Sequence, residues 1–340
     1  MKVVVIGATG NVGTSVVEAL AADTAVTEIV GVARRTPSSW HPAKTRFEAA
    51  DVRSPDVAQH LQGADAVVLL TWAFQPTHRP LETWDINVLG SMNALQAAAD
   101  AGVRTVVYAS SLAAYSPGAG RHVDESWPTH SVPTAAYGRE KAYLERYLDA
   151  YELRHPEIRV VRMRTCFIFK RSSASEQRRI FAGPLVPRAL LRPGRLPIVP
   201  LPAGLRFQAM HGQDAGEAYR LALLSDARGA YNVAADPIID GEALGKLMEA
   251  RAVQVPKQAV SAAMAGAWRL RLIPSDESLL KLFLSLPTLD TSRIRDELGW
   301  QPQYSGADAL REVMEAMAEG AGGPTPPLQP AGERSRSSSE

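Results

Sequence analysis

The segment Met1-Lys-Val-Val-Val-Ile-Gly-Ala-Thr-Gly-Asn-Val-Gly13 begins the chain and decides its fold. Its apolar, β-branched run at 3–6 predicts a short strand that is buried on both faces. Gly7, Gly10 and Gly13 come next, and a helical pattern follows them. In such a unit the first glycine permits a tight turn, the second lets the backbone approach a pyrophosphate, and the third lets the helix pack on the strand. We therefore predict a dinucleotide site; a glycine-rich turn in another kind of α/β protein is the alternative.

The composition is that of a globular protein. Of the 340 residues, 46% are hydrophobic and 21% are charged, and the formal net charge is +1, so we expect no nucleic-acid partner. The single cysteine, Cys166, excludes an internal disulfide and a cysteine-only metal site, and it favours a reducing compartment. No uncharged apolar run of about 18 residues is present, so we expect no membrane span. We predict a soluble, cytoplasmic protein that binds no metal.

Strand and helix patterns alternate through the first half of the chain. Strands are predicted at 3–6, 28–33, 46–50, 66–71, 105–110 and 158–164, and helices at 14–22, 88–101 and 136–152. This order predicts a Rossmann-type fold, a doubly wound parallel sheet with helices on both faces. We expect the dinucleotide-binding domain to span 1–165 and a smaller substrate-binding lobe, with segments that return to the first domain, to span 166–318. Pro, Gly and Ser dominate 319–340, which predicts a disordered tail.

The end of the second predicted strand bears on the choice of cofactor. In dinucleotide folds a carboxylate at this position usually binds the ribose 2′-hydroxyl, but here Ala33 is followed by Arg34 and Arg35. Two arginines without an acid favour a 2′-phosphate, so we predict NADP, with NAD as the alternative. The two side chains could also be solvated loop arginines. Asp51, after the third predicted strand, is placed either to contact the adenine or to cap the following helix.

A tyrosine and a lysine stand four residues apart in the predicted helix 136–152. Tyr137 and Lys141 therefore share one helical face, where an ammonium group would lower the pKa of the phenol toward that of a general acid/base. Ser110 and Ser111 end the fifth predicted strand, at the edge of the sheet where ligands bind. A hydroxyl there could bind the same substrate oxygen as the phenol. By itself, such a Tyr and Lys spacing is also common on protein surfaces.

Motifs along most of the chain occur in a characteristic order. They are GATGNVG at 7–13, DVR at 51–53, NVLGSMNAL at 87–95, VVYASSLAAY at 106–115, YGREK at 137–141, MHGQDAGEAY at 210–219, GAYNVA at 229–234 and ELGWQP at 297–302. Together they resemble the extended short-chain dehydrogenase/reductase superfamily, in particular its NAD(P)-dependent epimerase/dehydratase family. The chain departs from the family pattern at Ile6, Leu69, Thr71 and Lys170, none of which is a reacting group.

The resemblance implies a role for each matching residue. Tyr137 would be the catalytic acid/base, Lys141 its partner at the nicotinamide ribose, and Ser111, four residues before Tyr115, the catalytic serine. Asn87 would have a structural or proton-relay role beside the nicotinamide. The predicted cofactor-binding residues are Gly7, Thr9, Gly10, Asn11, Val12, Gly13, Arg34, Arg35, Asp51, Val52, Leu70, Thr71, Asn87, Tyr137 and Lys141.

These residues predict hydride transfer at a carbinol or carbonyl carbon, but they leave the substrate open. The segment 159–206 holds eleven basic residues and one acid, which could clamp the diphosphate of a nucleotide-sugar or form a solvated face. The apolar stretches 259–273 and 278–286 could instead line a pocket for a steroid-like or polyketide alcohol or ketone, or be core. An epimerase, a dehydrogenase or reductase, and a non-catalytic NADP-sensing module therefore remain as alternatives. His211 and Asp214 are expected to be structural, and a homodimer is expected by analogy only.

Overall fold

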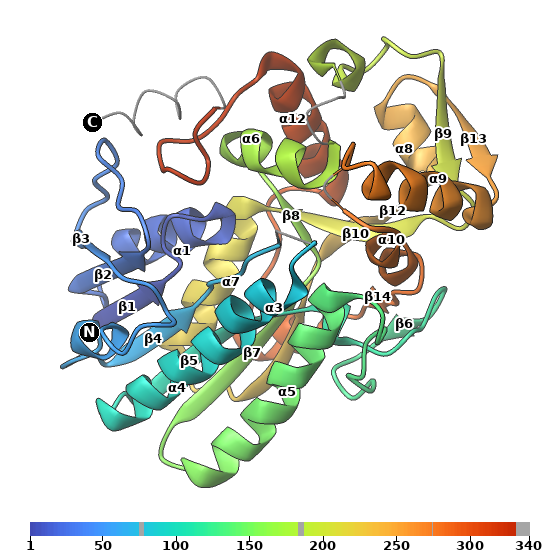
Figure 1. The fold of residues 1–340 in the computed structure, drawn as a ribbon. Coiled ribbons are helices and arrows are strands. Elements are labelled where there is room, and N and C mark those ends of the chain that lie inside the picture. Colours follow the sequence, from blue (N-terminus) through green and yellow to red (C-terminus); the bar gives the residue numbers. More distant parts are fainter. Residues whose placement is uncertain (75–77, 183–186, 274, 331–340) are drawn as a thin grey trace.

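A seven-stranded sheet, parallel throughout, forms the centre of the molecule (Figure 1). The computed structural model describes residues 1–74, 78–182, 187–273 and 275–330. The strand order is β3-β2-β1-β4-β5-β7-β11, which confirms the Rossmann-type prediction. The strands are β1 (Lys2–Ile6), β2 (Glu28–Ala33), β3 (Thr45–Ala49), β4 (Ala66–Leu69), β5 (Thr105–Ser111), β7 (Arg159–Thr165) and β11 (Gly229–Val233).

Alternate side chains of the first strand enter two different cores. Val3 and Val5 pack with α1 (Asn11–Ala22) and α7 (Gly212–Leu224) on one face of the sheet. On the opposite face, Val4 packs with three other helices, α2 (Val57–His60), α4 (Gly90–Asp100) and α5 (Ala136–Arg154). Because successive residues of a strand point to opposite faces, a continuous apolar run is what a sheet covered on both sides requires.

The strand order reverses direction between β1 and β4. Crossovers leave these two neighbouring strands toward opposite sides of the sheet, which opens a crevice beyond their carboxyl ends. The glycine loop follows β1 at this point, and Leu70 and Thr71 follow β4. The fold therefore places the predicted nucleotide residues at the position where such sheets bind ligands.

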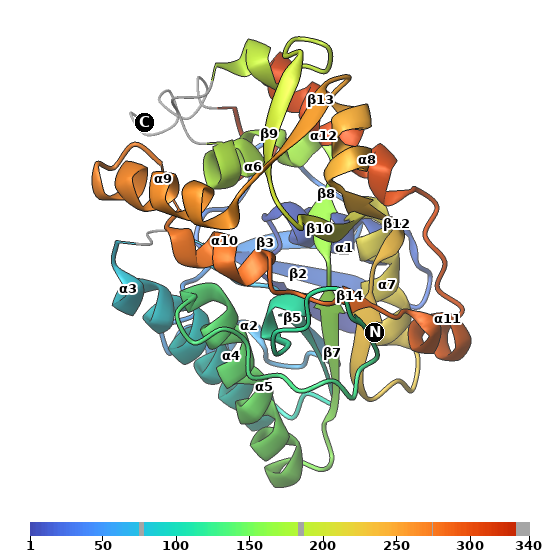
Figure 2. The same ribbon diagram turned by 90° about the vertical axis from the view of Figure 1, so that its right-hand side faces the viewer.

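The second half of the chain builds a lobe at one end of this sheet (Figure 2). A three-stranded sheet of β8 (Phe167–Phe169), β10 (Arg206–His211) and β12 (Ala235–Asp240) shares a core with α12 (Gly306–Glu319). The chain returns to the first domain through α7 and β11. The other elements are α3 (Pro80–Trp84), β6 (His122–Val123), α6 (Ala174–Gln177), β9 (Ile198–Pro202), α8 (Gly241–Leu247), β13 (Arg251–Val255), α9 (Lys257–Arg269), α10 (Glu277–Phe283), β14 (Thr288–Leu289) and α11 (Ser292–Leu298).

Most boundaries agree with the sequence patterns to within a few residues, but the fourth strand ends at Leu69 rather than at residue 71. The strands β8, β9, β12 and β13 carry no pattern that predicts them, because they are short and three of them are largely exposed. None of the helices in the described ranges has the length and hydropathy to cross a membrane.

The prediction of a disordered tail at 319–340 is wrong for its first part. Helix α12 extends to Glu319, and the following residues to Pro330 form an ordered segment in which the side chains of Thr325 and Leu328 are fully buried. Composition misled because this segment does not need a core of its own; it packs against the rest of the protein. The remaining residues, 331–340, lie outside the described part of the chain.

Candidate functional site

Each glycine of the loop after β1 meets a different constraint. Gly7 has a φ of +90°, and a Cβ there would lie 2.9 Å from the backbone nitrogen of Thr71. A Cβ on Gly13 would lie 2.2 Å from the carbonyl oxygen of Gly7, so this glycine lets α1 approach the loop. A Cβ on Gly10 would meet only one atom, at 3.6 Å, and would project toward the pockets described below. The first two glycines therefore serve the fold, and Gly10 leaves room for a ligand.

The first turn of α1 faces this room. Its N-cap is Gly10, which makes no side-chain capping bond. The first N–H groups of a helix lack intrahelical partners and carry partial positive charge, so they suit a pyrophosphate. The side-chain amide of Asn11, in the same turn, donates to the carbonyl of Ile168 at 2.9 Å. The buried Oδ1 of this amide has no hydrogen-bond partner in the structure. The free N–H groups of this turn and the unpaired Oδ1 of Asn11 are therefore available to a dinucleotide.

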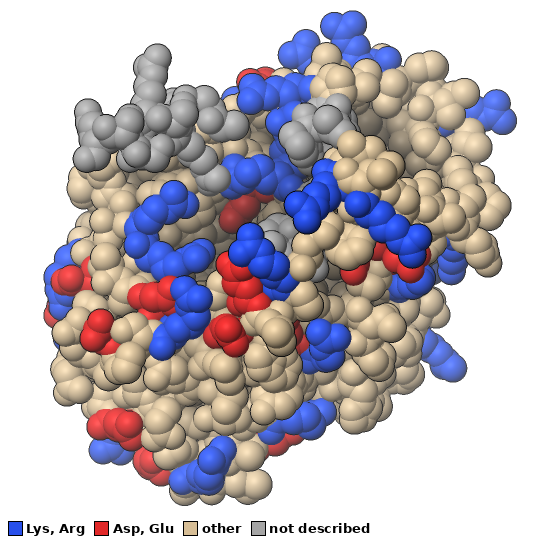
Figure 3. All heavy atoms as spheres, in the orientation of Figure 1, with Lys and Arg blue, Asp and Glu red and all other residues tan. Residues whose placement is uncertain are grey.

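Two pockets meet at the glycine loop. The tyrosine pocket lies between α1 and the residues Ser111, Tyr137 and Lys141. The arginine pocket lies on the other side of the loop, against Arg34 and Arg35. Both are lined by Gly7, Gly10, Leu70, Trp72 and Glu176. The molecular face in Figure 3 is hollowed near its centre, and Lys and Arg side chains stand around this hollow. A continuous groove of this kind fits the two halves of a dinucleotide.

Every predicted nucleotide-binding residue except Asn87 lines one of these pockets. In the arginine pocket, the Asp51 carboxylate accepts from the guanidinium and the backbone nitrogen of Arg53, and the guanidinium lowers the pKa of this carboxyl group. Asp51 does not cap α2, whose N-cap is Asp56. The helix-cap alternative is therefore wrong, and the adenine contact stays a prediction.

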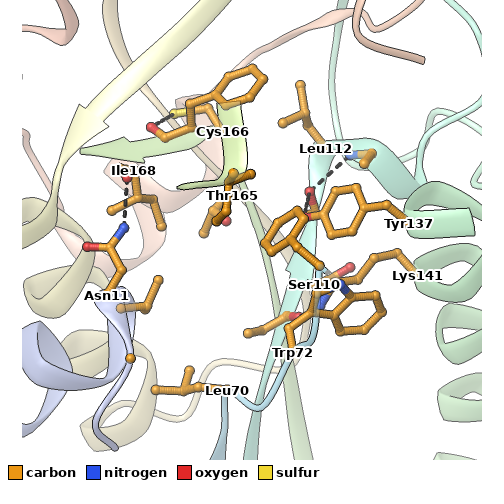
Figure 4. Close-up of a pocket in the computed structure, with 18 of the residues that line it drawn as sticks. Asn11, Leu70, Trp72, Ser110, Leu112, Tyr137, Lys141, Thr165, Cys166 and Ile168 are labelled. Atoms are coloured by element: carbon orange, nitrogen blue, oxygen red, sulfur yellow. Dashed lines mark hydrogen bonds between the residues drawn. The ribbon is translucent and has the colours of Figure 1, made fainter. Parts of the chain in front are cut away.

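Strand β5 and helix α5 bring the predicted catalytic hydroxyls together. The Tyr137 hydroxyl donates to Ser111 Oγ at 3.0 Å, and Ser111 Oγ also accepts from the backbone nitrogen of Ala113 at 3.1 Å. These bonds leave the Ser111 proton available to a substrate oxygen. Figure 4 shows Tyr137 and Lys141 on one side of the tyrosine pocket and Asn11 on the other.

The lysine does not act on the phenol as the sequence led us to expect. Lys141 Nζ donates to the carbonyl of Ala109 at 2.5 Å and lies 3.5 Å from the centre of the Trp72 ring. Burial lowers the pKa of Lys141 well below its usual value. Burial also raises the pKa of Tyr137 to about 12, and the hydrogen bond with Ser111 opposes this only in part. In this structure the predicted lowering of the tyrosine pKa is therefore wrong.

Asn87 lies behind the site rather than in its wall. Its amide accepts from Ala73 N at 2.7 Å and donates to Ala73 O at 2.9 Å and to Glu140 Oε2 at 2.7 Å. Thr83 donates to the other oxygen of the same buried carboxylate. These bonds agree with the structural role predicted for Asn87, while its contact with the nicotinamide stays a prediction. They position the chain after Trp72 against α5.

Ser110 belongs to a buried ion-pair cluster and not to the pocket chemistry. Its hydroxyl donates to Glu145 Oε1 at 2.5 Å. Arg164 contacts both oxygens of this carboxylate, at 3.0 and 2.9 Å, and Arg162 contacts one at 3.2 Å. Burial alone would raise the pKa of Glu145, but the guanidinium groups and Ser110 lower it to about 2. The cluster fixes α5 to β5 and β7, next to the predicted catalytic residue Ser111.

Much of the lining of the tyrosine pocket is apolar, although Asn11, Thr165, Glu176 and Gln177 also belong to it. Many of the apolar side chains come from β8, from the helical segment after α6, from α10 and the turn that follows it, and from two aromatic residues that follow β4. These side chains are Phe167, Ile168, Phe169, Ile180, Phe283, Leu286, Trp72 and Phe74. The Phe74 ring stacks on Tyr137 with 4.7 Å between centroids, and the Trp72 ring meets Tyr137 edge-on at 5.5 Å. Two aromatic rings therefore pack against the phenol of Tyr137.

Structural contacts occupy much of the basic segment 159–206. Arg159 donates to carbonyls at the end of α7, Lys170 donates to two hydroxyls of α1, and Arg171 pairs with Glu319. Other arginines are exposed on the lobe: Arg188, Arg192, Arg195 and Arg206. Of the described residues that line the tyrosine pocket, none is an arginine. The pocket beside the phenol therefore lacks a diphosphate clamp.

The contacts of three further residues considered in the sequence analysis indicate structural roles. The Asp214 carboxylate accepts from the backbone nitrogens of Gln303 and Tyr304, which fixes the segment after α11. His211 accepts from the first turn of α7 and so caps that helix. Cys166 lines the tyrosine pocket, but burial raises the pKa of its thiol, so it is a poor nucleophile. Among the described residues no cluster of His, Cys, Asp and Glu could hold a metal ion.

Sequence reasoning missed several residues of the groove, among them Trp72, Glu176 and Pro327. Trp72 lines both pockets and could have been found, since it follows the end of β4 as Thr71 does. Glu176 lines both pockets as well, from a short helix with no strong pattern. Pro327 lines the arginine pocket from a segment whose composition indicates disorder.

Comparisons with known proteins agree with this geometry. The family model described as "NAD dependent epimerase/dehydratase family" matches residues 3–234. An uncharacterized protein of Mycobacterium bovis is 26% identical over 326 residues, covering 91% of this chain and 82% of that one. N-acetyl-alpha-D-glucosaminyl-diphospho-ditrans,octacis-undecaprenol 4-epimerase of Escherichia coli O157:H7 is 33% identical over 158 residues, covering 46% and 45%.

Solved structures share the fold. UDP-glucose-4-epimerase from Stenotrophomonas maltophila, with bound NAD and formylated UDP-arabinopyranose, is similar with a TM-score of 0.71 at 20% identity, covering 94% of this chain and 98% of that one. The dTDP-glucose 4,6-dehydratase DesIV of Streptomyces venezuelae gives a TM-score of 0.68 at 21% identity, covering 94% and 97%. The predicted fold, family and enzyme class are confirmed. The chain therefore belongs to the NAD dependent epimerase/dehydratase family, as an enzyme of the extended short-chain dehydrogenase/reductase type.

Proposed function

We propose that this enzyme is an NADP-linked dehydrogenase or reductase that acts on the carbonyl or secondary alcohol group of an apolar compound. The observation that carries the proposal is the lining of the tyrosine pocket, most of whose residues are aromatic or aliphatic and none of whose described residues is an arginine. Pockets of this kind bury apolar ligands and use a few polar groups for orientation. Here the polar groups stand where a substrate oxygen would bind.

The chain's own residues supply binding and proton transfer. Ser111 can donate to the substrate oxygen and hold it beside the Tyr137 hydroxyl, 3.0 Å away. Tyr137 then gives its proton to the carbonyl oxygen in reduction, or accepts it from the alcohol in oxidation. A bound nicotinamide supplies or accepts the hydride at the adjacent carbon. Lys141 lines the same pocket and is held by its hydrogen bond to Ala109 O, where it would bind the nicotinamide ribose.

The test is a cofactor-linked assay. The purified protein is incubated with NADPH and a panel of apolar ketones of increasing size, and the nicotinamide absorbance is followed. We expect net loss of NADPH, with the specificity constant rising as the apolar body of the ketone grows. UDP-sugars are assayed in parallel by product chromatography. Interconversion of UDP-sugars without net change in absorbance, and no turnover of any ketone, would contradict the proposal.

That contrary result defines the second candidate, a nucleotide-sugar epimerase. The partial match to the Escherichia coli 4-epimerase favours it. The lining of the tyrosine pocket opposes it, because a diphosphate would need cations and the nearest basic segment is largely engaged in structural contacts. An epimerase recycles its nicotinamide, whereas a dehydrogenase or reductase exchanges it, so the assay separates the two.

The preference for NADP rests on the arginine pocket. Strand β2 ends at Ala33, and the two exposed guanidinium groups of Arg34 and Arg35 line the pocket beside it. The double variant Arg34→Ala with Arg35→Ala should raise the Kd of NADPH by about 10- to 100-fold, the loss expected for charge-assisted hydrogen bonds to a phosphate. The Kd of NADH should change less than about threefold. Fluorescence titration measures both values. The matched control is Arg104→Ala, because Arg104 lies just before β5, at the amino ends of the strands, whereas the groove lies at their carboxyl ends. Equal losses for both nucleotides would contradict NADP preference.

The raised pKa of Tyr137 gives a pH dependence. With a pKa of about 12 the phenol is protonated near neutral pH, so it is ready to donate in reduction, while oxidation needs the rare phenolate. Below that pKa, the phenolate fraction grows tenfold per pH unit. We therefore expect kcat for alcohol oxidation to rise by about tenfold per unit between about pH 6 and pH 8, while ketone reduction changes little. Steady-state kinetics at saturating nucleotide measure both; an oxidation rate that is flat over this range would refute the assignment of Tyr137 as base.

A further inference from the structure

The ordered segment 320–330 crosses the protein beside the nucleotide groove, and we call it the strap. It begins at Gly320, whose φ of +76° ends α12 and turns the chain back. In Figure 1 the red strap runs from α12 past α6 toward the end of α1. Its own backbone bonds, Gly323 N to Leu328 O at 2.8 Å and Leu328 N to Thr325 O at 2.9 Å, close it into a compact loop. Five of its eleven residues are proline or alanine, which lose little side-chain entropy on ordering.

One contact joins the strap to the glycine loop. The hydroxyl of Thr325, fully buried, donates to the carbonyl of Thr9 at 2.7 Å. The nitrogen of the same peptide group, Gly10 N, donates to Gly7 O at 3.2 Å. The Thr9–Gly10 peptide is therefore held at both ends. Since this peptide leads into the uncapped first turn of α1, its orientation sets the direction of the N–H groups that face the groove.

Other contacts join the strap to α6 and to the groove wall. Ser175 donates to Gln329 O at 2.9 Å, and the Arg179 guanidinium donates to Pro327 O at 2.5 Å. Between these anchors, Pro327 and Glu176 line the arginine pocket, and Glu176 also lines the tyrosine pocket. The strap thus contributes Pro327 to the wall of the arginine pocket, and it is bonded to the two residues that flank this part of the wall in sequence, Ser175 before Glu176 and Arg179 after it.

We propose that the strap is part of the dinucleotide-binding site: Thr325 orients the Thr9–Gly10 peptide toward the diphosphate, and Pro327 forms a wall of the groove beside the adenosine half. This inference rests on the nucleotide use proposed above. The strap lines the arginine pocket through Pro327, and none of its residues lines the tyrosine pocket, where Ser111, Tyr137 and Lys141 lie. It therefore contributes to nucleotide affinity and not to the chemical step.

The test uses a matched pair at one residue. Thr325→Val keeps the shape of the side chain but removes the donor, and Thr325→Ser keeps the donor. We expect Thr325→Val to raise the Kd of NADPH by about 3- to 12-fold, the effect of one lost hydrogen bond, and Thr325→Ser to stay within about twofold of the unchanged protein. For Thr325→Val the KM for NADPH should rise by the same factor as the Kd. Equal Kd values for all three proteins would overturn the proposal.

A truncation extends the test to the whole strap. The chain ending at Gly320 is compared with the chain ending at Pro330, which retains the strap, and we expect at least a tenfold higher Kd for the shorter one. If the shorter chain fails to fold, hydrogen exchange on the full chain decides instead: NADPH should slow exchange at Gly323 and Leu328, whose N–H groups close the strap. Unchanged exchange there while NADPH slows exchange in the first turn of α1 would overturn the strap proposal alone. A full chain that binds neither NADPH nor NADH would overturn the proposed nucleotide use, and the strap proposal with it.

Discussion

Tyr137→Phe is expected to lower kcat by about 10²- to 10⁴-fold while the Kd of NADPH stays within about twofold. The variant removes the hydroxyl that donates to Ser111 and would protonate the substrate oxygen, and proton transfer by a positioned side chain contributes an effect of this size. The ring itself stays, so its packing against Phe74 and Trp72 is retained. Single-turnover kinetics with NADPH and a ketone found in the panel measure the loss, and fluorescence titration measures the Kd.

Tyr143→Phe is the matched control, because Tyr143 lies on the same helix but with its ring exposed against Trp84. Its kcat should be unchanged. If Tyr137→Phe turns over normally, the phenol is not the acid/base. If neither the unchanged protein nor Tyr137→Phe has any turnover but both bind NADPH tightly, the result would favour a non-catalytic NADP-sensing module over an enzyme.

The second large effect concerns stability. Glu145→Ala should lower the free energy of unfolding by about 3–5 kcal/mol, because it leaves the buried guanidinium groups of Arg162 and Arg164 without their shared carboxylate. Chemical denaturation followed by circular dichroism measures the loss. Glu48→Ala is the control: it breaks an exposed pair with Arg46 and should cost less than about 1 kcal/mol. Equal losses in the two variants would show that the cluster contributes no more than a surface pair.

The same carboxylate predicts an acid response. Its pKa in the folded protein, about 2, lies below the ordinary value of 4.5 that applies to the unfolded chain. The stabilising contribution is therefore fully present above about pH 4.5 and is lost as the pH falls toward 2. The difference in unfolding free energy between the unchanged protein and Glu145→Ala should shrink over this range. A difference that stays constant down to pH 3 would contradict the assignment.

The parts of the site that the sequence predicts well are those whose geometry is local. The glycine loop, with Gly7 and Gly13, is a turn of a few residues whose backbone admits no side chain, so spacing alone locates it. The spacing of Tyr137 and Lys141 likewise follows from one helix. The approach of Tyr137 to Ser111 depends on how the helix packs on the sheet. It could still be predicted, because Ser111 ends a strand at the carboxyl edge of the sheet, where ligands bind.

The parts that could not be predicted depend on contacts between distant segments. Thr325 meets Thr9 across 316 positions of the chain, and nothing in a run of proline and glycine indicates such a partner. The pKa of Tyr137 depends on burial that sequence spacing does not reveal. Asn87 is bonded to Glu140 and lines neither pocket of the groove. The domain boundaries, the cytoplasmic location and a homodimer stay predictions.

The origin of the two sides of the tyrosine pocket has an evolutionary consequence. Ser111, Tyr137 and Lys141 come from the first half of the chain, before residue 142, whereas another part of the pocket lining comes from β8, from the segment around Ile180 and from α10. Mutations in the lobe can therefore reshape the cavity without moving the proton-transfer groups. A lineage built on this plan could change the compound that it binds and keep the chemistry proposed above, so relatives within it would be a poor guide to the substrate.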